Sequence, residues 1–156
     1  MPDAPQIVGW REWVALPDLG VPALKAKLDT GARTSALHAE QITPFDRDGA
    51  PWVRFVVRPR PKHPETAFTC EAPVVGRRAV RSSNGQTQTR YVIRTSVALG
   101  EQTWPIECTL TRRTGMRFPM LLGRTALAGH YAVDPAAGYV TGRAFAAAYR
   151  TKRTRS

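Results

Sequence analysis

The sequence is poor in cysteine, in acidic residues and in long apolar runs, and each shortage excludes a class of protein. Its two cysteines, Cys70 and Cys108, do not form a Cys-x-x-Cys pair, so we expect reduced thiols and no thiolate metal or redox site. No run approaches the ~20 apolar residues of a membrane-spanning helix. The first residues also lack the basic start and apolar core of a secretory signal. We therefore expect a cytoplasmic protein without a membrane partner.

Acidic residues are scarcest in the second half of the chain. The 156 residues carry a formal charge of +11, and residues 79–156 hold 12 Lys and Arg against three acids. Such a field attracts polyanions, which include nucleic acid, the ribosomal surface and acidic peptides. Because no nucleic-acid-binding motif is present and aromatic residues do not cluster among the arginines, we expect no specific nucleic-acid partner.

Short apolar segments separated by turn residues predict an all-β, barrel-like fold. Val21–Leu28 alternates in part between apolar residues and lysines, which is typical of a strand with one buried face. Asn84-Gly85 is a strong hairpin signal. The length predicts one domain over residues 1–149, followed by a basic, disordered tail at 150–156. The expected strands are Ile7–Leu16, Val21–Leu28, Ser35–Phe45, Trp52–Val57, Phe68–Val75, Arg77–Arg81, Gln88–Leu99, Trp104–Thr111, Met120–Leu122, Tyr131–Val133 and Tyr139–Val140, with helical turns at Arg124–Ala128 and Phe145–Tyr149.

Asp29-Thr30-Gly31 stands directly after the strand predicted at Val21–Leu28, and this triplet occurs once in the chain. On its own, the triplet is also explained as a simple turn, in which Asp and Gly serve the backbone geometry. A second apolar segment, Met120–Leu122, runs in the same way into Gly123-Arg124. An active loop is favoured over a chance turn only because the two segments, in this order, resemble a known paired signature.

Leu28–Ala32 and Met120–Leu127 together resemble the paired signature of retropepsin-like aspartic proteases. Three further stretches, Leu28–Ala39, Gln86–Ile93 and Leu110–Met116, are similar to a bacterial single-lobe branch of these proteins. Its members are often labelled ATP-dependent zinc proteases and can be encoded beside ATP-grasp glutamate ligases. The resemblance covers roughly residues 7 to 142. It implies a single-lobe acid-protease barrel with a short helix after the Gly-Arg motif.

The resemblance also implies catalytic roles for Asp29, Thr30 and Gly31. Two carboxylates within hydrogen-bond reach share one proton, so that one activates a water and the other polarises the scissile carbonyl. Because the triplet occurs once, the second carboxylate must come from a second copy, and we expect a homodimer. The Thr30 hydroxyl is expected to bond across the dimer axis. Support of the active loop is expected from Ala32, His38, Leu122, Gly123 and Arg124.

Neither the zinc label nor the ATP label is supported by the residues. There is no His-Glu-x-x-His sequence, and His38, His63 and His130 lack the spacing of metal ligands. No phosphate-binding Gly-x-x-x-x-Gly-Lys loop occurs either. We therefore expect no cofactor and no metal.

A flap over the active loop is expected at Ser82–Thr87, where Gly85 would allow opening and closing. The 94-residue spacing between Asp29 and Gly123 is long for a compact viral enzyme, and an extra hairpin at about 50–72 explains it. Arginines near the loop favour acidic or glutamate-rich peptides, although a solvated rim is the alternative. The expected substrate-binding residues are Arg33, Gly85, Gln86, Gln88, Arg90, Arg112 and Arg113.

One position departs from the viral relatives and affects Arg124. In those relatives the corresponding Arg pairs with an acid shortly after Asp-Thr-Gly, but here Arg33 and Thr34 stand there. We expect Arg124 to bind a backbone carbonyl or Glu107 instead. The leading hypothesis is thus a homodimeric aspartic endopeptidase. The alternative is a non-catalytic module of the same shape that binds an acidic protein or the ribosomal surface.

Overall fold

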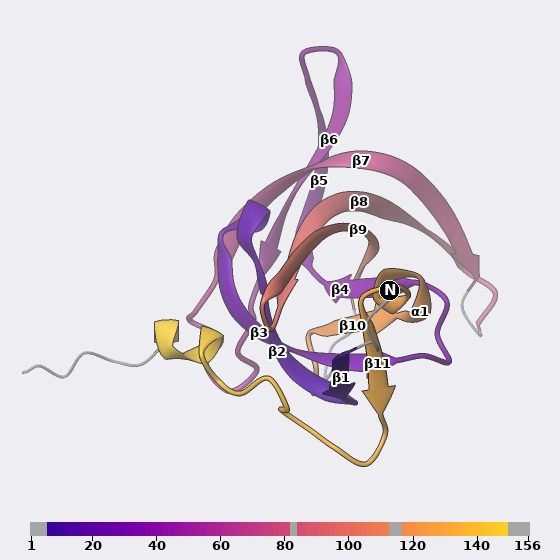
Figure 1. Ribbon diagram of the computed structural model, residues 1–156. Helices are drawn as coiled ribbons and strands as arrows, with labels where there is room; N and C mark the ends of the chain where they lie inside the picture. Colours follow the sequence, from indigo (N-terminus) through magenta and orange to yellow (C-terminus); the bar gives the residue numbers. More distant parts are fainter. Residues whose placement is uncertain (1–5, 82–83, 113–116, 150–156) are drawn as a thin grey trace, which may run out of the picture.

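Strands make up most of the computed structural model, which describes residues 6–81, 84–112 and 117–149 (Figure 1). This confirms the all-β prediction. Within this part of the chain, no helix is both long and apolar enough to cross a bilayer. In chain order the elements are β1 (Gln6–Gly9), β2 (Arg11–Leu16), η1 (Pro17–Leu19), β3 (Val21–Asp29), β4 (Ser35–His38), β5 (Glu40–Arg47), β6 (Ala50–Val57), β7 (Phe68–Arg81), β8 (Thr87–Leu99), β9 (Gln102–Thr111), β10 (Met120–Gly123), α1 (Arg124–Leu127), β11 (Tyr131–Asp134) and η2 (Phe145–Tyr149).

Six strands close into a barrel in the order β2-β3-β10-β4-β9-β8. The ring closes where Ala15 of β2 lies opposite Ala98 of β8. Apolar side chains fill the interior, because alternate residues of each strand point inward. Burial of this apolar surface is the main stabilising contribution to such a fold. Fully buried members include Leu16, Leu24, Leu37, Ile93, Leu99, Leu110, Met120 and Leu122.

Three more strands, β7, β6 and β5, continue the sheet outward from β8. In Figure 1 the β5–β6 hairpin projects from the barrel, and its turn uses positive φ angles at Asp48 and Gly49. On this extension the Arg47 guanidinium, and then that of Arg54, hydrogen-bond to Glu71 and hold the pKa of its carboxyl below the usual value. The hairpin expected at about 50–72 corresponds to β6 and β7, joined by the proline-rich loop.

Several predicted strands differ in extent from those observed. Ile7–Leu16 is divided at Trp10 into β1 and β2, because β1 leaves the barrel to pair with β11. Ser35–Phe45 is divided at Ala39, close to the positive φ of Gln41. Conversely, the two short strands expected between Phe68 and Arg81 form one strand, β7, with a register shift between Val74 and Gly76.

The strand predicted at Tyr139–Val140 is wrong. Tyr139 has a φ of 56°, which is incompatible with an extended strand. Instead, its N–H donates to the Arg11 carbonyl (2.8 Å), and the N–H of Val140 donates to the Glu12 carboxylate (2.9 Å). Polar contacts with β2 therefore hold this segment in place of a ladder.

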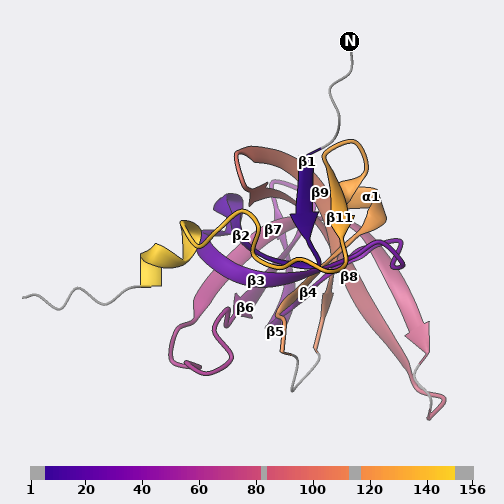
Figure 2. The same cartoon turned by 60° about the horizontal axis from the view of Figure 1, so that its bottom comes forward.

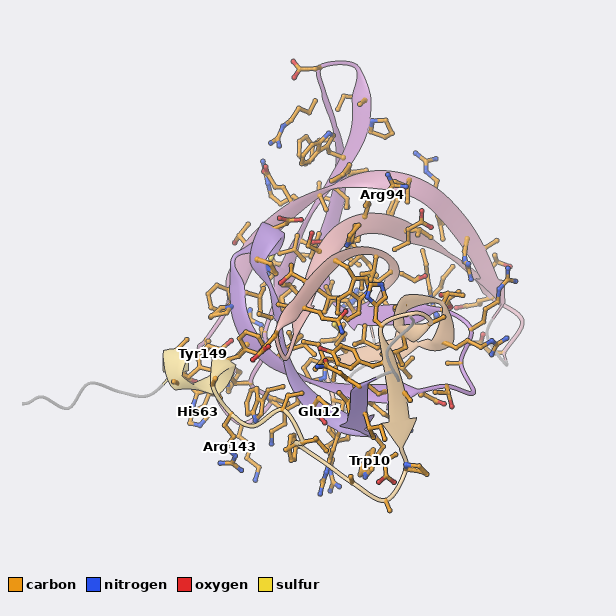
Figure 3. The ribbon with its side chains drawn as sticks, in the orientation of Figure 1. Trp10, Glu12, His63, Arg94, Arg143 and Tyr149 are labelled. Carbon is orange, nitrogen blue, oxygen red and sulfur yellow. The ribbon has the colours of Figure 1, made fainter. Side chains whose placement is uncertain are left out.

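Glu12 is a fully buried carboxylate that joins the two ends of the described chain (Figure 3). It accepts hydrogen bonds from the N–H groups of Gly9 (2.6 Å) and Val140 (2.9 Å), and from the N–H and hydroxyl of Thr141. Further along, the Tyr149 hydroxyl of η2 donates to the Ala23 carbonyl of β3. The helix expected at Phe145–Tyr149 is thus a 3₁₀-helix tied to the barrel wall.

Candidate active site

Asp29 lies at the end of β3, where a short strand from far along the chain inserts beside it. β10 pairs parallel with β3, which sets Leu122 opposite Leu28 and Gly123 opposite Asp29. On its other side β10 pairs antiparallel with β4. The buried Leu28 and Leu122 side chains fix this register, since a one-residue slip would expose both. The two motifs, 94 residues apart in sequence, therefore end side by side.

A tight turn orients the Asp29 carboxylate. The Gly31 N–H donates to Oδ1 of Asp29 (2.9 Å), and the Ala32 N–H donates to the Asp29 carbonyl (3.1 Å). A side chain at position 31 would bring its Cβ within 3.1 Å of that Oδ1. Asp29 is half-buried, whereas Thr30 and Gly31 are exposed. The turn thus presents one oriented carboxylate at the surface.

The first two residues of helix α1 hold the loop that follows the Asp29 turn. The N–H groups of Arg124 and Thr125 donate to the carbonyls of Ala32 (2.8 Å) and Arg33 (3.2 Å). The Thr125 hydroxyl donates to the Arg33 carbonyl as well (2.7 Å), and Nη1 of Arg124 reaches the Gly31 carbonyl (3.3 Å). Arg124 therefore binds a backbone carbonyl, whereas Glu107 contacts Arg94. Thr125 carried no sequence signal beyond its place after Gly-Arg.

Gly123 is required by the close approach of this loop. A Cβ at this position would lie 2.5 Å from the Thr34 carbonyl oxygen and 2.8 Å from that of Ala32. The Gly123 N–H donates to the hydroxyl of Ser35 (3.0 Å), a residue that is buried at the start of β4. Sequence reasoning missed Ser35, although a hydroxyl in an otherwise apolar strand calls for a specific partner.

The expected flap lies between β7 and β8. Both views place the tip of this hairpin on the same side of the barrel as the turn after β3 (Figures 1 and 2). Gly85 has a φ of 87°, and the Gln86 N–H donates to Oδ1 of Asn84 (3.1 Å). Gln86 and Gln88 are exposed, while Arg90 is half-buried. Ser82 and Ser83 lie outside the described residues.

The other predicted site residues are dispersed. Arg33 is exposed on the active loop, and Arg112 is exposed just after β9. Arg113 lies outside the described residues. His38 is at the opposite end of β4 from Ser35, where its Nε2 lies 3.5 Å from a Glu40 oxygen. The His38 N–H also donates to the carbonyl of Pro119, just before β10 (2.8 Å).

Cys108 of β9 lies in the barrel wall and Cys70 of β7 in the sheet extension, and both are buried and protonated at neutral pH. Burial raises the pKa of Cys70 to about 11 and that of Cys108 to about 12. Nucleophilic and metal-binding cysteines act as thiolates, which neither residue forms under these conditions. Among the described residues, no group of three or more His, Cys, Asp or Glu side chains is arranged to hold a metal.

Comparisons with known proteins agree with this geometry. Residues 7–144 match the RimB-like family, described as retropepsin-like aspartic endopeptidase RimB. A protein named probable alpha-L-glutamate ligase from Parasynechococcus marenigrum is 50% identical over 136 residues, which are 87% of this chain and 29% of that protein. A protein of the same name from Shewanella pealeana is 46% identical over 142 residues, or 91% of this chain and 31% of that one. The chain thus spans about a third of the length of these relatives.

A solved structure has a similar fold over nearly its whole length. The Legionella pneumophila protein Lpg0085, of unknown function, superimposes with a TM-score of 0.75 and 34% identity, covering 88% of this chain and 99% of that one. The chain forms an aspartic protease-like module, and it belongs to the RimB-like family of retropepsin-like aspartic endopeptidases.

Proposed function

We propose that the chain is an aspartic endopeptidase whose active site forms between two identical copies, each contributing Asp29. The observation that carries the proposal is the register of Asp29 with Gly123, because it fixes a carboxylate in a turn held from behind by α1. One chain supplies one such turn, since Asp-Thr-Gly occurs once. A two-fold axis beside the exposed Thr30 supplies the second in an isologous dimer.

The reaction is general acid–base hydrolysis of a peptide bond. The two carboxylates share one proton and titrate as a unit, because close like charges cannot both ionise cheaply. The ionised member takes a proton from a bound water, whose oxygen attacks the scissile carbonyl carbon. The protonated member donates its proton to the carbonyl oxygen, which gives a gem-diol. The C–N bond then breaks as the carboxyl that took the water proton passes a proton to the amine nitrogen, while the other carboxylate takes a proton back from a gem-diol hydroxyl. The Gly31 N–H keeps Asp29 oriented through these transfers.

The proposed dimer does not require the salt bridge between an arginine and an acid that viral relatives have. Arg124 already binds the Gly31 carbonyl of its own loop, and Arg33 leaves that loop without an acid at this position. The Thr30 hydroxyls, exposed in the single chain, bond to the opposite loop across the axis. Weak association is therefore expected, with tighter dimers when substrate bridges the two copies.

The proposed substrates are acidic or glutamate-rich peptides. Arg33 and Arg112 are exposed near the loop and the end of β9, and a guanidinium binds a carboxylate in a bidentate fork. Relatives of this chain are named probable alpha-L-glutamate ligases, which supports a link with glutamate. Cleavage of oligoglutamate-tagged peptides should exceed that of neutral peptides and fall at high salt. Equal cleavage of both at every salt concentration contradicts this specificity.

Mixing wild-type protein with Asp29→Asn tests the shared site. The total protein concentration is kept well above the dimer dissociation constant, with saturating substrate, so that nearly all chains are paired. At a fixed amount of wild type, an equal amount of the variant should then reduce activity to about half, because random exchange places half of the wild-type chains in one-carboxylate dimers. Asp46→Asn is the matched control, since Asp46 is exposed on the β5–β6 extension, and it should leave activity unchanged. Unchanged activity with excess Asp29→Asn contradicts a site made by two copies.

A non-catalytic binding module is the second candidate. It is favoured by the size of the relatives, of which this chain matches about a third and which carry the name of a ligase. In that case Asp29→Asn would retain binding of the acidic partner and no turnover would be lost, because wild type would have none.

A further inference from the structure

A hollow lies on the outer wall of the barrel, separate from the active loop. Its volume is about 280 Å³, enough for one or two side chains of a ligand. One wall is formed by Trp13 of β2 and Lys25 of β3, which lie opposite each other in the β2–β3 pairing. The rest comes from the proline-rich loop and from Arg117. We call this hollow the loop pocket, lined by Trp13, Lys25, Pro59, Arg60, Pro61, Lys62, His63 and Arg117.

The lining of the loop pocket is entirely cationic or neutral. Lys25, Arg60, Lys62 and Arg117 contribute four positive charges, and no Asp or Glu is among the described residues that form it. The nearby Glu65 lies 3.5 Å from the imidazole of His63 and is itself exposed. Four cations brought together in a concave site focus a positive potential and favour an anionic ligand.

The loop carrying two of these cations, Arg60 and Lys62, has a defined conformation. The His63 N–H donates to the Arg60 carbonyl (2.8 Å), and the Thr66 N–H donates to the His63 carbonyl (3.0 Å). Arg58 ties the loop to β5, because it donates to both the Pro64 carbonyl (2.6 Å) and the Glu40 carboxylate (3.1 Å). Donors that are positioned in advance lose less entropy when a ligand binds.

Aromatic rings beside the pocket are already covered by cations of this chain. The Lys25 ammonium lies 5.5 Å from the Trp13 ring centre, and the Arg60 guanidinium lies 4.9 Å from that of Tyr149. These ring faces are therefore unavailable for stacking nucleobases, as single-stranded nucleic acid would require. The Trp13 indole nitrogen is buried without a hydrogen-bond partner among the described residues, so its NMR signal reports on changes at the pocket wall and not on a direct bond to the ligand.

The loop pocket is within reach of a peptide bound at the active loop. Lys25 and Asp29 are on the same strand and share its outer face, four residues apart. At the rise of an extended strand, this separation is about 13 Å. A segment of four or five extended residues can therefore span both sites.

We propose that the loop pocket is a docking site for a carboxylate side chain of an acidic peptide, separate from the catalytic carboxylates. The choice of peptide rests on the proposed function, whereas binding at the pocket does not require catalysis. Lys25, Arg60 and Lys62 receive the carboxylate, and Trp13 contributes to the wall beside them.

The test is a titration of Asp29→Asn protein with hexaglutamate, so that no ligand is hydrolysed, followed by NMR of the indole N–H groups. The Trp13 signal, identified with Trp13→Phe, should move, while that of Trp104 should not, because its N–H already donates to the Ala126 carbonyl (2.9 Å). Arg60→Gln with Lys62→Gln should weaken binding by roughly tenfold or more. Arg94→Gln is the control for loss of positive charge outside the pocket. Figure 3 shows Arg94 far from His63 and Tyr149.

Three outcomes overturn the proposal. The first is a Trp13 signal that stays in place at saturating hexaglutamate. The second is a loss of affinity in Arg94→Gln equal to that of the double variant, which would indicate attraction by net charge alone. The third is movement of Trp13 with a single-stranded oligonucleotide but not with hexaglutamate. None of them bears on whether paired Asp29 residues hydrolyse peptides, which the mixing experiment decides.

Discussion

Asp29 at the end of β3 lies directly opposite Gly123 at the end of β10, and a Cβ on Gly123 would come within 2.5 Å of the Thr34 carbonyl oxygen. The loop that carries the carboxylate therefore closes over a position where only hydrogen fits. This relationship links the two motifs mechanically, because any side chain at 123 must displace the loop.

We predict that Gly123→Ala displaces the active loop. Backbone must move to admit the methyl group, so the free energy of unfolding should fall by about 1–3 kcal/mol, and turnover should be lost. Denaturant unfolding and peptide cleavage measure the two effects. Gly76→Ala is the control, since its Cβ would meet Val92 at an ordinary 3.8 Å. Normal activity in Gly123→Ala would contradict the tight closure.

Ser35→Ala should also destabilise the site. The Ser35 hydroxyl accepts the buried Gly123 N–H at 3.0 Å, and an unsatisfied buried donor costs about 1–3 kcal/mol. Thermal or denaturant unfolding measures this loss. Ser96→Ala is a suitable control, because Ser96 meets Asp18 through its backbone N–H. If the two variants were equally stable, the hydrogen bond between Ser35 and Gly123 would not contribute to the free energy of unfolding.

Arg124→Gln separates positioning of the loop from stability. Arg124 is exposed, so its loss should change the free energy of unfolding by no more than about 0.5 kcal/mol. Its guanidinium holds the Gly31 carbonyl, however, and a slightly misplaced carboxylate lowers turnover by roughly ten- to a hundredfold. Steady-state kinetics should show the effect in kcat, with Arg94→Gln unaffected. A change confined to stability would assign Arg124 a purely structural role.

The cysteines should be inert in the native protein. Because burial raises their pKa values from 9.0 to about 11 for Cys70 and about 12 for Cys108, both remain thiols at pH 8. Reagents that need a thiolate should label neither until the protein unfolds, when both should react. Rapid labelling of folded protein at pH 8 would contradict their burial.

The same shifts affect stability in alkali. A raised pKa in the folded state means that the native protein retains protons that the unfolded chain releases. The associated stability is present below pH 9 and is lost as the pH rises towards 11. Denaturant unfolding between pH 8 and pH 11 checks this, with Cys70→Ala and Cys108→Ala as the variants that should reduce the decline.

The sequence predicted those strands whose conformation is determined by residues close to them in the chain. Alternation identified β3, and the apolar run before Gly123 identified β10. The break at Trp10 could not be predicted in this way, since it depends on β11, over 120 residues later, pairing with β1. Glu12 and Ser35 were missed for the same reason, because their partners are distant backbone groups.

The distance between the two Asp29 carboxylates in a crystal structure of the assembled protein decides whether two copies form one active site. We predict a symmetric dimer in which the nearest oxygens of the two carboxylates are about 3–4 Å apart, close enough to share one proton. Two results would contradict this prediction. One is a fully active protein whose two Asp29 side chains lie on distant surfaces, and the other is a fully active protein that remains monomeric in solution at high concentration.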